Sequence, residues 1–309
     1  MSAPTFAANI KSNMERGMEM KDEEKLYKRD GILYSTIMSP PENLDALKDL
    51  EAREDDVMLV AYPKCGCNWM VGVLRKIMTT CGYTLSERPP LIEFHSPDAQ
   101  KNAAQMPSRR FFATHLHPDY IPVSFKTNKT KMLVVFRNPK DTVVSYYHFM
   151  NKNPVLPKAE SWDKFFSDFM SGEVGWGSYF DHALAWEKHM DDPNVLIVTY
   201  EELKENLNEG VKKITDFFSF RLTDEQVMVI AGESTFSAMQ SSSISSHGKF
   251  GNVFFRKDIL RLQKKKQRIG LAVPIVSEVS LECGGPTRVA TSMTSGTEST
   301  LGQFVIQTS

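Results

Sequence analysis

The sequence predicts an α/β protein, a single domain in which helices flank a central parallel β-sheet. Two observations carry this prediction. Short apolar runs rich in Val, Ile, Leu and Phe recur along the chain, and segments with helical spacing of apolar residues lie between them. Strands that alternate with helices form parallel sheets, whose ligands bind beyond the carboxyl ends of the strands. We therefore expect the functional residues in the loops that follow the strands.

Four apolar runs are expected to form the strands. Each contains a continuous apolar segment rather than an alternating one, which is typical of parallel strands covered on both faces. In chain order they are VMLVAYP (57–63), RRFFATHL (109–116), KMLVVFRNP (131–139) and NVLIVTY (194–200).

Helical spacing predicts helices after these strands. The first helix, at 67–82, ends at Gly82, which suits a helix stop. A second, at 141–150, follows an Asn-Pro pair, and Pro is favoured in the first turn of a helix. After the fourth strand comes a charged segment ending in ITDFFSF, and then Thr223 and Gln226 make the capping-box pattern of a last short helix.

Charge and cysteine content exclude several classes of protein. The 309 residues carry 37 Lys and Arg against 38 Asp and Glu, so nothing favours nucleic acid or an anionic membrane as a partner. The N-terminus lacks a secretory signal and no apolar run approaches the ~18 residues of a membrane span, so we expect a soluble cytosolic protein. The cysteines are too few and too irregularly spaced for a disulfide scaffold or a zinc site, so we expect reduced thiols and no metal. They are Cys65, Cys67, Cys81 and Cys283.

The loop after the first strand has the features of an anion site. It runs from Tyr62 to Trp69 and leads into the N-terminus of an amphipathic helix. Free backbone N–H groups and the positive end of the helix dipole converge at such a point. Lys64 adds a positive charge, and Gly66 lets the backbone curl closely around a ligand. The alternative is a tight turn with a surface lysine and no ligand.

The same loop differs from the Walker A sequence G-x-x-x-x-G-K-[ST]. That pattern places its Lys at the end of the loop, beside a Ser or Thr that binds magnesium. Here Lys64 comes first and no such hydroxyl follows. We therefore expect an anion site that works without metal, and a small-molecule kinase is disfavoured.

Two motifs resemble those of the cytosolic sulfotransferases, most closely of the 6B branch. YPKCGCNW at 62–69 resembles the family's 5'-phosphosulfate-binding loop, usually YPKSGTTW. FRNPKDTVVSYYHF at 136–149 is similar to its 3'-phosphate motif, in which Arg137 and Ser145 would hold the phosphate. An Arg fork at a strand end suits a dianionic phosphate, and a Ser on the following helix can donate to the same oxygens. The resemblance covers about residues 40–257.

The resemblance implies both the fold and the donor. The fold would be the P-loop-NTPase-like fold of sulfotransferases, and the donor would be 3'-phosphoadenosine 5'-phosphosulfate (PAPS), bound without a metal. Tyr200 would approach the adenine, and Phe236 would stack on it. The nucleotide-binding residues implied in this way are Lys64, Cys65, Gly66, Cys67, Asn68, Trp69, Arg137, Ser145, Tyr200, Ser234, Thr235, Phe236, Arg256 and Lys257.

A histidine at the end of the second strand matches the family's general base. The segment Ala113-Thr114-His115-Leu116-His117 is similar to the family's Lys-Thr-His-Leu-Pro, which aligns His115 with the base. An imidazole accepts a proton near neutral pH. His117 competes for the role, but it lies where the family has a turn. Ala113 replaces a Lys, which removes one cation from the transition state and implies slower chemistry or a more acidic acceptor.

The resemblance implies a direct sulfuryl transfer to a small molecule. His115 would take the acceptor proton, the acceptor oxygen would attack sulfur in line, and Lys64 with the loop amides would neutralise the departing 3',5'-ADP. The acceptor would be a phenol or alcohol, either endogenous or xenobiotic. Phe94, Phe111 and Tyr146 are candidates for its pocket and equally for the core.

The end of the sequence departs from the family. The family closes its nucleotide site with Arg-Lys-Gly-x-x-Gly-Asp-Trp-Lys-Asn, of which only Arg256 and Lys257 remain here, followed by Asp258. The alternative to an active enzyme is therefore an impaired variant that is unstable or binds 3',5'-ADP weakly. A homodimer is compatible with the resemblance, although the family's usual dimer motif is absent.

These patterns divide the chain into three parts. Residues 1–40 are expected to form a flexible N-terminal segment, and residues 41–257 the sulfotransferase domain. Residues 258–309 have no sustained helical or strand period and are rich in Ser, Thr and Gly, so we expect a poorly ordered tail.

Overall fold

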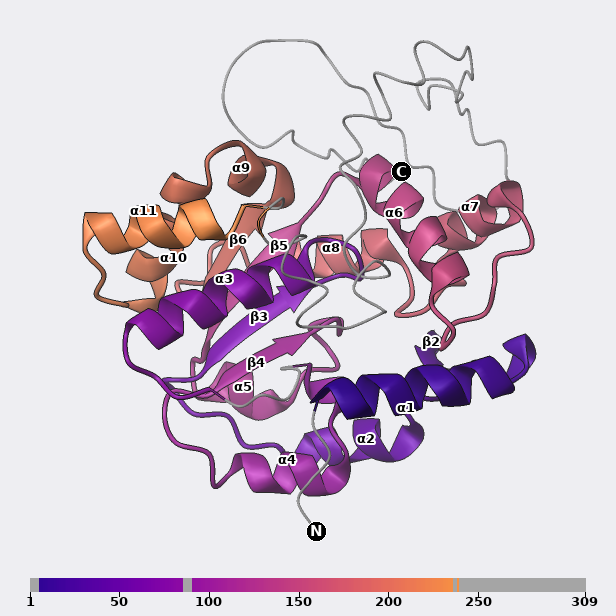
Figure 1. Cartoon of the computed structure of the whole chain (residues 1–309). Helices are drawn as coiled ribbons and strands as arrows, with labels where there is room; N and C mark the ends of the chain where they lie inside the picture. Colours follow the sequence, from indigo (N-terminus) through magenta and orange to yellow (C-terminus); the bar gives the residue numbers. More distant parts are fainter. Residues whose placement is uncertain (1–5, 86–90, 236–237, 239–309) are drawn as a thin grey trace, which may run out of the picture. The chain divides into compact units, whose positions relative to one another are not determined.

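A computed structural model describes residues 6–85, 91–235 and 238 of the chain (Figure 1). Three of the expected nucleotide-binding residues, Phe236, Arg256 and Lys257, lie outside the described residues. The same holds for the expected tail at 258–309 and for Asp258.

The four expected strands form one parallel sheet, which confirms the predicted fold class. The strands are β3 (Val57–Ala61), β4 (Phe111–Thr114), β5 (Lys131–Phe136) and β6 (Val195–Thr199), in the spatial order β4-β3-β5-β6. Val57 pairs with Phe111 of β4 and with Lys131 of β5, so the central strands begin and end at nearly the same level. The loops that follow them therefore meet at one edge of the sheet.

Helices surround the sheet as the alternation predicts (Figure 1). The predicted helix at 67–82 is α3, which packs on β3, and Gly82 lies just beyond its end at φ +87°. The expected capping box at Thr223 and Gln226 is present at the start of the last helix. The helices are α1 (Phe6–Glu19), α2 (Pro41–Ala46), α3 (Cys67–Thr80), α4 (Pro97–Ala103), α5 (Val123–Thr127), α6 (Pro139–Lys152), α7 (Trp162–Ser171), α8 (Tyr179–Glu187), α9 (Tyr200–Glu205), α10 (Leu207–Phe218) and α11 (Asp224–Glu233), with short 3₁₀ helices η1 (Asp22–Glu24), η2 (Leu47–Asp49) and η3 (Ile92–Phe94).

The first forty residues differ from the expected flexible segment. They contain α1 and an antiparallel hairpin of β1 (Leu26–Arg29) and β2 (Ile32–Ser35). Asp30 and Gly31 join the two strands with φ values of +50° and +83°. Asp-Gly is a strong two-residue hairpin signal because both positions need positive φ. Met14 and Tyr34 are buried, so apolar burial fixes this segment to the core.

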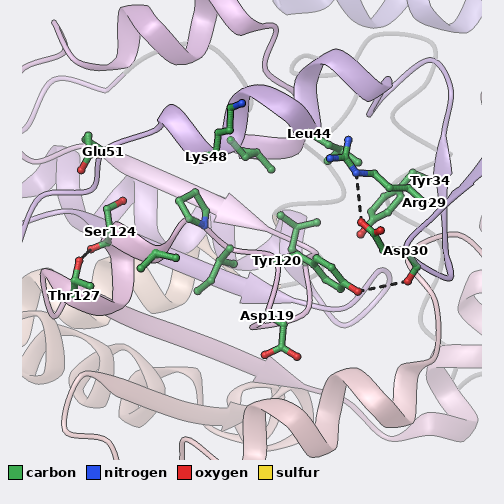
Figure 2. A pocket seen from close by; sticks show the side chains of 15 residues that line it. Arg29, Asp30, Tyr34, Leu44, Lys48, Glu51, Asp119, Tyr120, Ser124 and Thr127 are labelled. Atoms are coloured by element: carbon green, nitrogen blue, oxygen red, sulfur yellow. Dashed lines mark hydrogen bonds and ion pairs between the residues drawn. The ribbon is translucent and has the colours of Figure 1, made fainter.

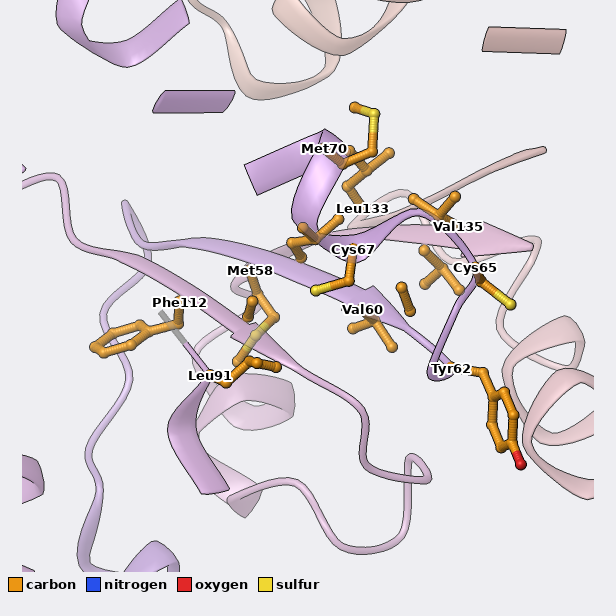
Figure 3. Packing of buried hydrophobic residues seen from close by; sticks show 14 of the residues in the cluster. Met58, Val60, Tyr62, Cys65, Cys67, Met70, Leu91, Phe112, Leu133 and Val135 are labelled. Atoms are coloured by element: carbon orange, nitrogen blue, oxygen red, sulfur yellow. The ribbon is translucent and has the colours of Figure 1, made fainter. Parts of the chain in front are cut away.

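The core is continuous around β3, whose five residues are all buried. Because β3 lies between two other strands and under helices, both of its faces are covered, which explains its unbroken apolar sequence. Figure 3 shows side chains of β3 and β5, such as Val60 and Leu133, in one cluster with Cys65 of the following loop and Cys67 at the start of α3. The loop thus starts from the rigid centre of the molecule.

A buried ion pair lies at the start of β3 and β4, at the edge opposite these loops. Arg110 donates from Nε to Oδ1 of Asp56 at 2.7 Å, and its Nη2 contacts Oδ2 of the same carboxylate. The guanidinium also donates to the carbonyl oxygens of Ala103 and Glu51, at 3.1 and 2.8 Å. Both side chains are inaccessible to solvent, so each charge depends on these partners.

Replacing Asp56 by Ala is expected to lower the free energy of unfolding by about 3–5 kcal/mol, because it leaves the Arg110 charge buried and unpaired. Urea denaturation of purified protein measures this change. The matched control is Asp55→Ala at the adjacent, partly exposed residue, which should stay within about 0.5 kcal/mol of the wild type. Equal losses in the two variants would contradict the role of the ion pair.

Candidate functional site

The loop between β3 and α3 has an unusual backbone, as the sequence predicts. Lys64 has φ +70°, and Gly66, which precedes the first residue of α3, has φ +99°. A Cβ at Gly66 would lie 2.9 Å from Cδ2 of Tyr200, so the close approach of this ring also requires glycine. Since the first N–H groups of a helix have no acceptor within it, the N-terminus of α3 suits an anion.

Arg137 joins the loops that follow the central strands. It comes directly after β5, and its Nη1 donates to the carbonyl oxygen of Lys64 at 2.8 Å. Its guanidinium lies over the ring of Tyr200, with Cζ 4.4 Å from the ring centre. The hydroxyl of Tyr179 donates to the carbonyl oxygen of Arg137. The structure therefore brings Lys64, Arg137 and Tyr200 together from three separate strand ends.

Trp69 and Ser234 extend this cluster. The Trp69 ring meets the Tyr200 ring edge to face at 5.1 Å, and its Nε1 donates to the carbonyl oxygen of Ser234 at 2.6 Å. Arg137 Nε and Ser234 Oγ are both buried, and the described part of the chain provides neither with a hydrogen-bond partner. Buried polar groups are normally paired, so these two atoms mark the place where a polar ligand fits.

The remaining expected nucleotide contacts differ in accessibility. Lys64, Gly66 and Asn68 are partly accessible, whereas the side chains of Cys65 and Cys67 are buried. Burial raises the pKa of Cys65 to about 12, and it also raises the pKa of Cys67. Both thiols are therefore neutral beside the anion loop, and any contact from these two residues to a ligand comes from the backbone.

Ser145 and Thr235 are the outlying members of the expected set. Ser145 lies on α6 with 9% of its surface exposed. The hydroxyl of Thr235 accepts a hydrogen bond from the backbone N–H of Ala238 at 3.3 Å.

His115 follows β4 at the same edge of the sheet. Its Nδ1 lies 2.5 Å from the carbonyl oxygen of Ala61, which can only accept, so Nδ1 carries the hydrogen and Nε2 is the basic atom. The pKa of His115 is lowered to about 4, mainly by burial; the bond to Ala61 opposes this shift, and the nearby Lys64 charge adds to it. The imidazole is thus neutral and able to accept a proton across the physiological pH range.

His117 has different surroundings. Its Nδ1 lies 3.4 Å from Oδ2 of Asp119, and the centre of its ring lies 6.0 Å from that of the Tyr120 ring. These partners belong to the turn after the strand.

Aromatic rings surround His115. The centre of the Trp176 ring lies 5.4 Å from that of the imidazole, and the centre of the Phe94 ring lies 6.3 Å from it. The planes of both rings are steeply inclined to the imidazole plane, at 81° and 69°. The other two candidate pocket aromatics are in the core: Phe111 is buried in β4, and the hydroxyl of buried Tyr146 donates to the carbonyl oxygen of Gly175 at 2.8 Å. Trp176 was missed by the sequence analysis, and the glycines on either side of it were the available signal.

Glu93 is a second residue that the sequence analysis missed. It precedes Phe94 in η3 and is fully buried. Its carboxylate accepts from the backbone N–H of His115 at 2.8 Å and from the hydroxyl of Thr114 at 3.0 Å. Burial raises the pKa of Glu93 to about 7, although these hydrogen bonds oppose the rise.

A separate pocket of about 490 Å³ lies beyond the loop that bears His115. Figure 2 shows it between the β1–β2 turn, the α2–η2 segment and residues 119–127. Leu116 lines it, but none of the expected catalytic or nucleotide-binding residues does. The pocket is therefore not part of the site built around His115.

Comparisons with known proteins agree with this geometry. Residues 54–268 match the family model described as the sulfotransferase domain. The chain belongs to the sulfotransferase family. It is 70% identical over 253 residues to Sulfotransferase 6B1 of Danio rerio, covering 81% of this chain and 86% of the relative. Sulfotransferase 6B1 of Mus musculus is 43% identical over 254 residues, covering 82% and 84%.

Solved sulfotransferase structures have the same fold. A mouse sulfotransferase, SULT7A1, complexed with PAP, has a TM-score of 0.70 and 38% sequence identity over 76% of this chain and 85% of its own. The resemblance to cytosolic sulfotransferases of the 6B branch and the expected class of enzyme, a PAPS-dependent sulfotransferase, are thus confirmed.

Within the described residues, no helix is long and apolar enough to cross a membrane. No group of three or more His, Cys, Asp or Glu side chains in the same residues is arranged to hold a metal ion.

Replacing Gly66 by Ala is expected to lower the free energy of unfolding by more than the ~1–3 kcal/mol of a strained backbone, because the new Cβ also collides with Tyr200. The matched control is Gly82→Ala, at φ +87° with nothing within 4 Å of the added Cβ. Urea denaturation compares the two variants. Similar losses of unfolding free energy in both variants would show that the collision with Tyr200 adds nothing to the cost of the strained backbone.

Proposed function

We propose that this chain transfers a sulfuryl group from PAPS to the hydroxyl of a small phenol or alcohol in the cytosol. The observation that carries the proposal is the position of His115. Its basic Nε2 belongs to the same sheet edge as the Lys64 loop, and the Lys64 charge affects its pKa. A proton acceptor and an anion loop at one strand edge suit group transfer to a hydroxyl.

The nucleotide side of the site fits 3',5'-ADP. Arg137 Nε and Ser234 Oγ are buried donors without a partner among the residues described, and the Tyr200 and Trp69 rings lie beside them. Donors and rings together suit a phosphorylated adenosine. The complex of mouse SULT7A1 with PAP, which is another abbreviation for 3',5'-ADP, supports this assignment at 38% sequence identity. PAPS, when bound, supplies the sulfuryl group that is transferred.

The acceptor side fits an aromatic alcohol. Phe94 and Trp176 stand at steep angles to the His115 ring, and the ammonium group of Lys64 lies 4.2 Å from the centre of the Phe149 ring. Aromatic rings with one polar group are typical of small-molecule sites. A phenol suits them because its ring packs on theirs while its hydroxyl faces the base.

The low pKa of His115 bears on the mechanism. A base with a pKa of about 4 accepts a proton from a neutral alcohol weakly, so an acidic phenol is the better acceptor. A bound anionic donor raises the pKa of His115, because a nearby negative charge favours the imidazolium form. The bond from Nδ1 to Ala61 keeps Nε2 as the accepting atom throughout.

Thermal unfolding with 3',5'-ADP tests the nucleotide site. A ligand present at 100 times its dissociation constant stabilises the folded state by about 2.7 kcal/mol, so the midpoint should rise with 3',5'-ADP and not with 5'-AMP. Arg137→Met should remove the shift, whereas Lys140→Met on the exposed face of α6 should retain it. If no shift occurs with the wild type, the chain is the impaired variant instead.

Replacing His115 by Ala should lower kcat with PAPS and 4-nitrophenol at least about 100-fold, because a general base contributes roughly 10²–10⁴. The shift in unfolding midpoint with 3',5'-ADP should persist, since the contacts of Arg137 remain. His117→Ala is the matched control and should keep kcat within a few fold. Near-normal turnover by the His115 variant would overturn its assignment as the base.

A further inference from the structure

Glu93 links the base to the neighbouring backbone by a short chain of hydrogen bonds. The N–H of Leu116 donates to the Thr114 hydroxyl at 3.0 Å, and this hydroxyl donates to Oε2 of Glu93 at 3.0 Å. The N–H of His115 donates to Oε1 at 2.8 Å. One carboxylate therefore receives, directly or through Thr114, the backbone N–H groups of His115 and of the residue after it.

We propose that the ionised carboxylate of Glu93 is a positioning element for sulfuryl transfer, holding His115 at the angle at which Nε2 meets the acceptor hydroxyl. This inference rests on the proposed function. Glu93 also sits in η3 next to Phe94, and Nδ2 of Asn43 supports it by donating to its carbonyl oxygen at 3.5 Å. The same residue thus ties the base to an aromatic wall of the acceptor site.

The pattern of donors is that of an ionised carboxylate. A protonated Glu93 must donate its own hydrogen, and Thr114 Oγ1, which already accepts from Leu116, is its neighbour. Donation to Thr114 would turn the Thr114 hydroxyl away from Glu93. Protonation therefore reverses one link of the chain and loosens the segment that carries His115.

The groups facing Glu93 carry no charge near pH 7. In the described part of the chain these titratable groups are Tyr34 of β2, Cys67 of α3 and His115 after β4. Burial raises the pKa of Tyr34 and of Cys67 and lowers that of His115 to about 4. In the chain without bound PAPS, none of these three neighbours changes charge between pH 6 and 8, so ionisation in that range is assigned to Glu93, with its pKa of about 7.

The test compares wild type, Glu93→Gln and the exposed control Glu54→Gln with PAPS and 4-nitrophenol between pH 5.5 and 8.5. The amide of Glu93→Gln resembles the protonated carboxyl at every pH. We expect wild type and Glu54→Gln to gain activity with a midpoint near pH 7, and Glu93→Gln to have a flat kcat about 10- to 100-fold below their plateau. KM for PAPS should not change. Thr114→Val should also lower the plateau of kcat, because it removes the link through the hydroxyl, and Thr114→Ser should retain the wild-type profile.

Unfolding provides a readout that needs no turnover. The folded pKa of about 7 lies above the unfolded value of 4.5, so the folded state binds the extra proton between them. Stability from this group is present below pH 4.5 and is lost as pH rises through 7. The unfolding midpoint of the wild type should therefore fall relative to that of Glu93→Gln as the pH rises from 4.5 through 7.

The two hypotheses fail in different ways. A wild type that transfers no sulfuryl group to 4-nitrophenol or 2-naphthol overturns the proposed function and the positioning role with it. The positioning role alone is overturned if the wild type is active and Glu93→Gln keeps the full kcat and the rise of activity near pH 7. A variant that loses stability but not kcat also overturns it, because Glu93 would then serve only the fold.

Discussion

The hydrogen bond from Arg137 to the carbonyl oxygen of Lys64 is the interaction on which the site depends. It joins the loops that follow two adjacent parallel strands, β3 and β5, and places the guanidinium over Tyr200 at the end of a third. The parallel register makes this contact available, because it brings the ends of the strands to one level. His115 reaches the same edge from β4 and is fixed there by the carbonyl oxygen of Ala61, the last residue of β3.

Much of this arrangement was readable from the sequence, for physical reasons. Strands buried on both faces are continuous apolar runs, so all four were found, and the positive φ at Gly66 agrees with its expected role in the loop. The hairpin in the first forty residues was missed although Asp30-Gly31 signals it, because its strands are short and partly buried and show no clear period.

The contacts of Glu93 and Trp176 with His115 arise only when distant segments meet, so the glycines beside Trp176 indicate a turn but not its neighbour. Glu93 contacts His115 across 22 positions of sequence, and Trp176 approaches His115 from the segment before α8. The candidate aromatics illustrate the same limit. Phe94 contacts the ring of His115, whereas Phe111 and Tyr146 pack inside, and composition alone does not separate an aromatic of the core from one beside His115.

The two thiols of the anion loop have a consequence for how the protein meets oxidants and electrophiles. Thiolates are the reactive form of cysteine, and burial keeps Cys65 and Cys67 protonated as well as covered. Sulfenic acid formation and glutathione adducts begin at an exposed thiolate. The backbone of the loop between β3 and α3 is therefore insulated from the redox state of its surroundings, since neither thiol offers a reactive form to solvent.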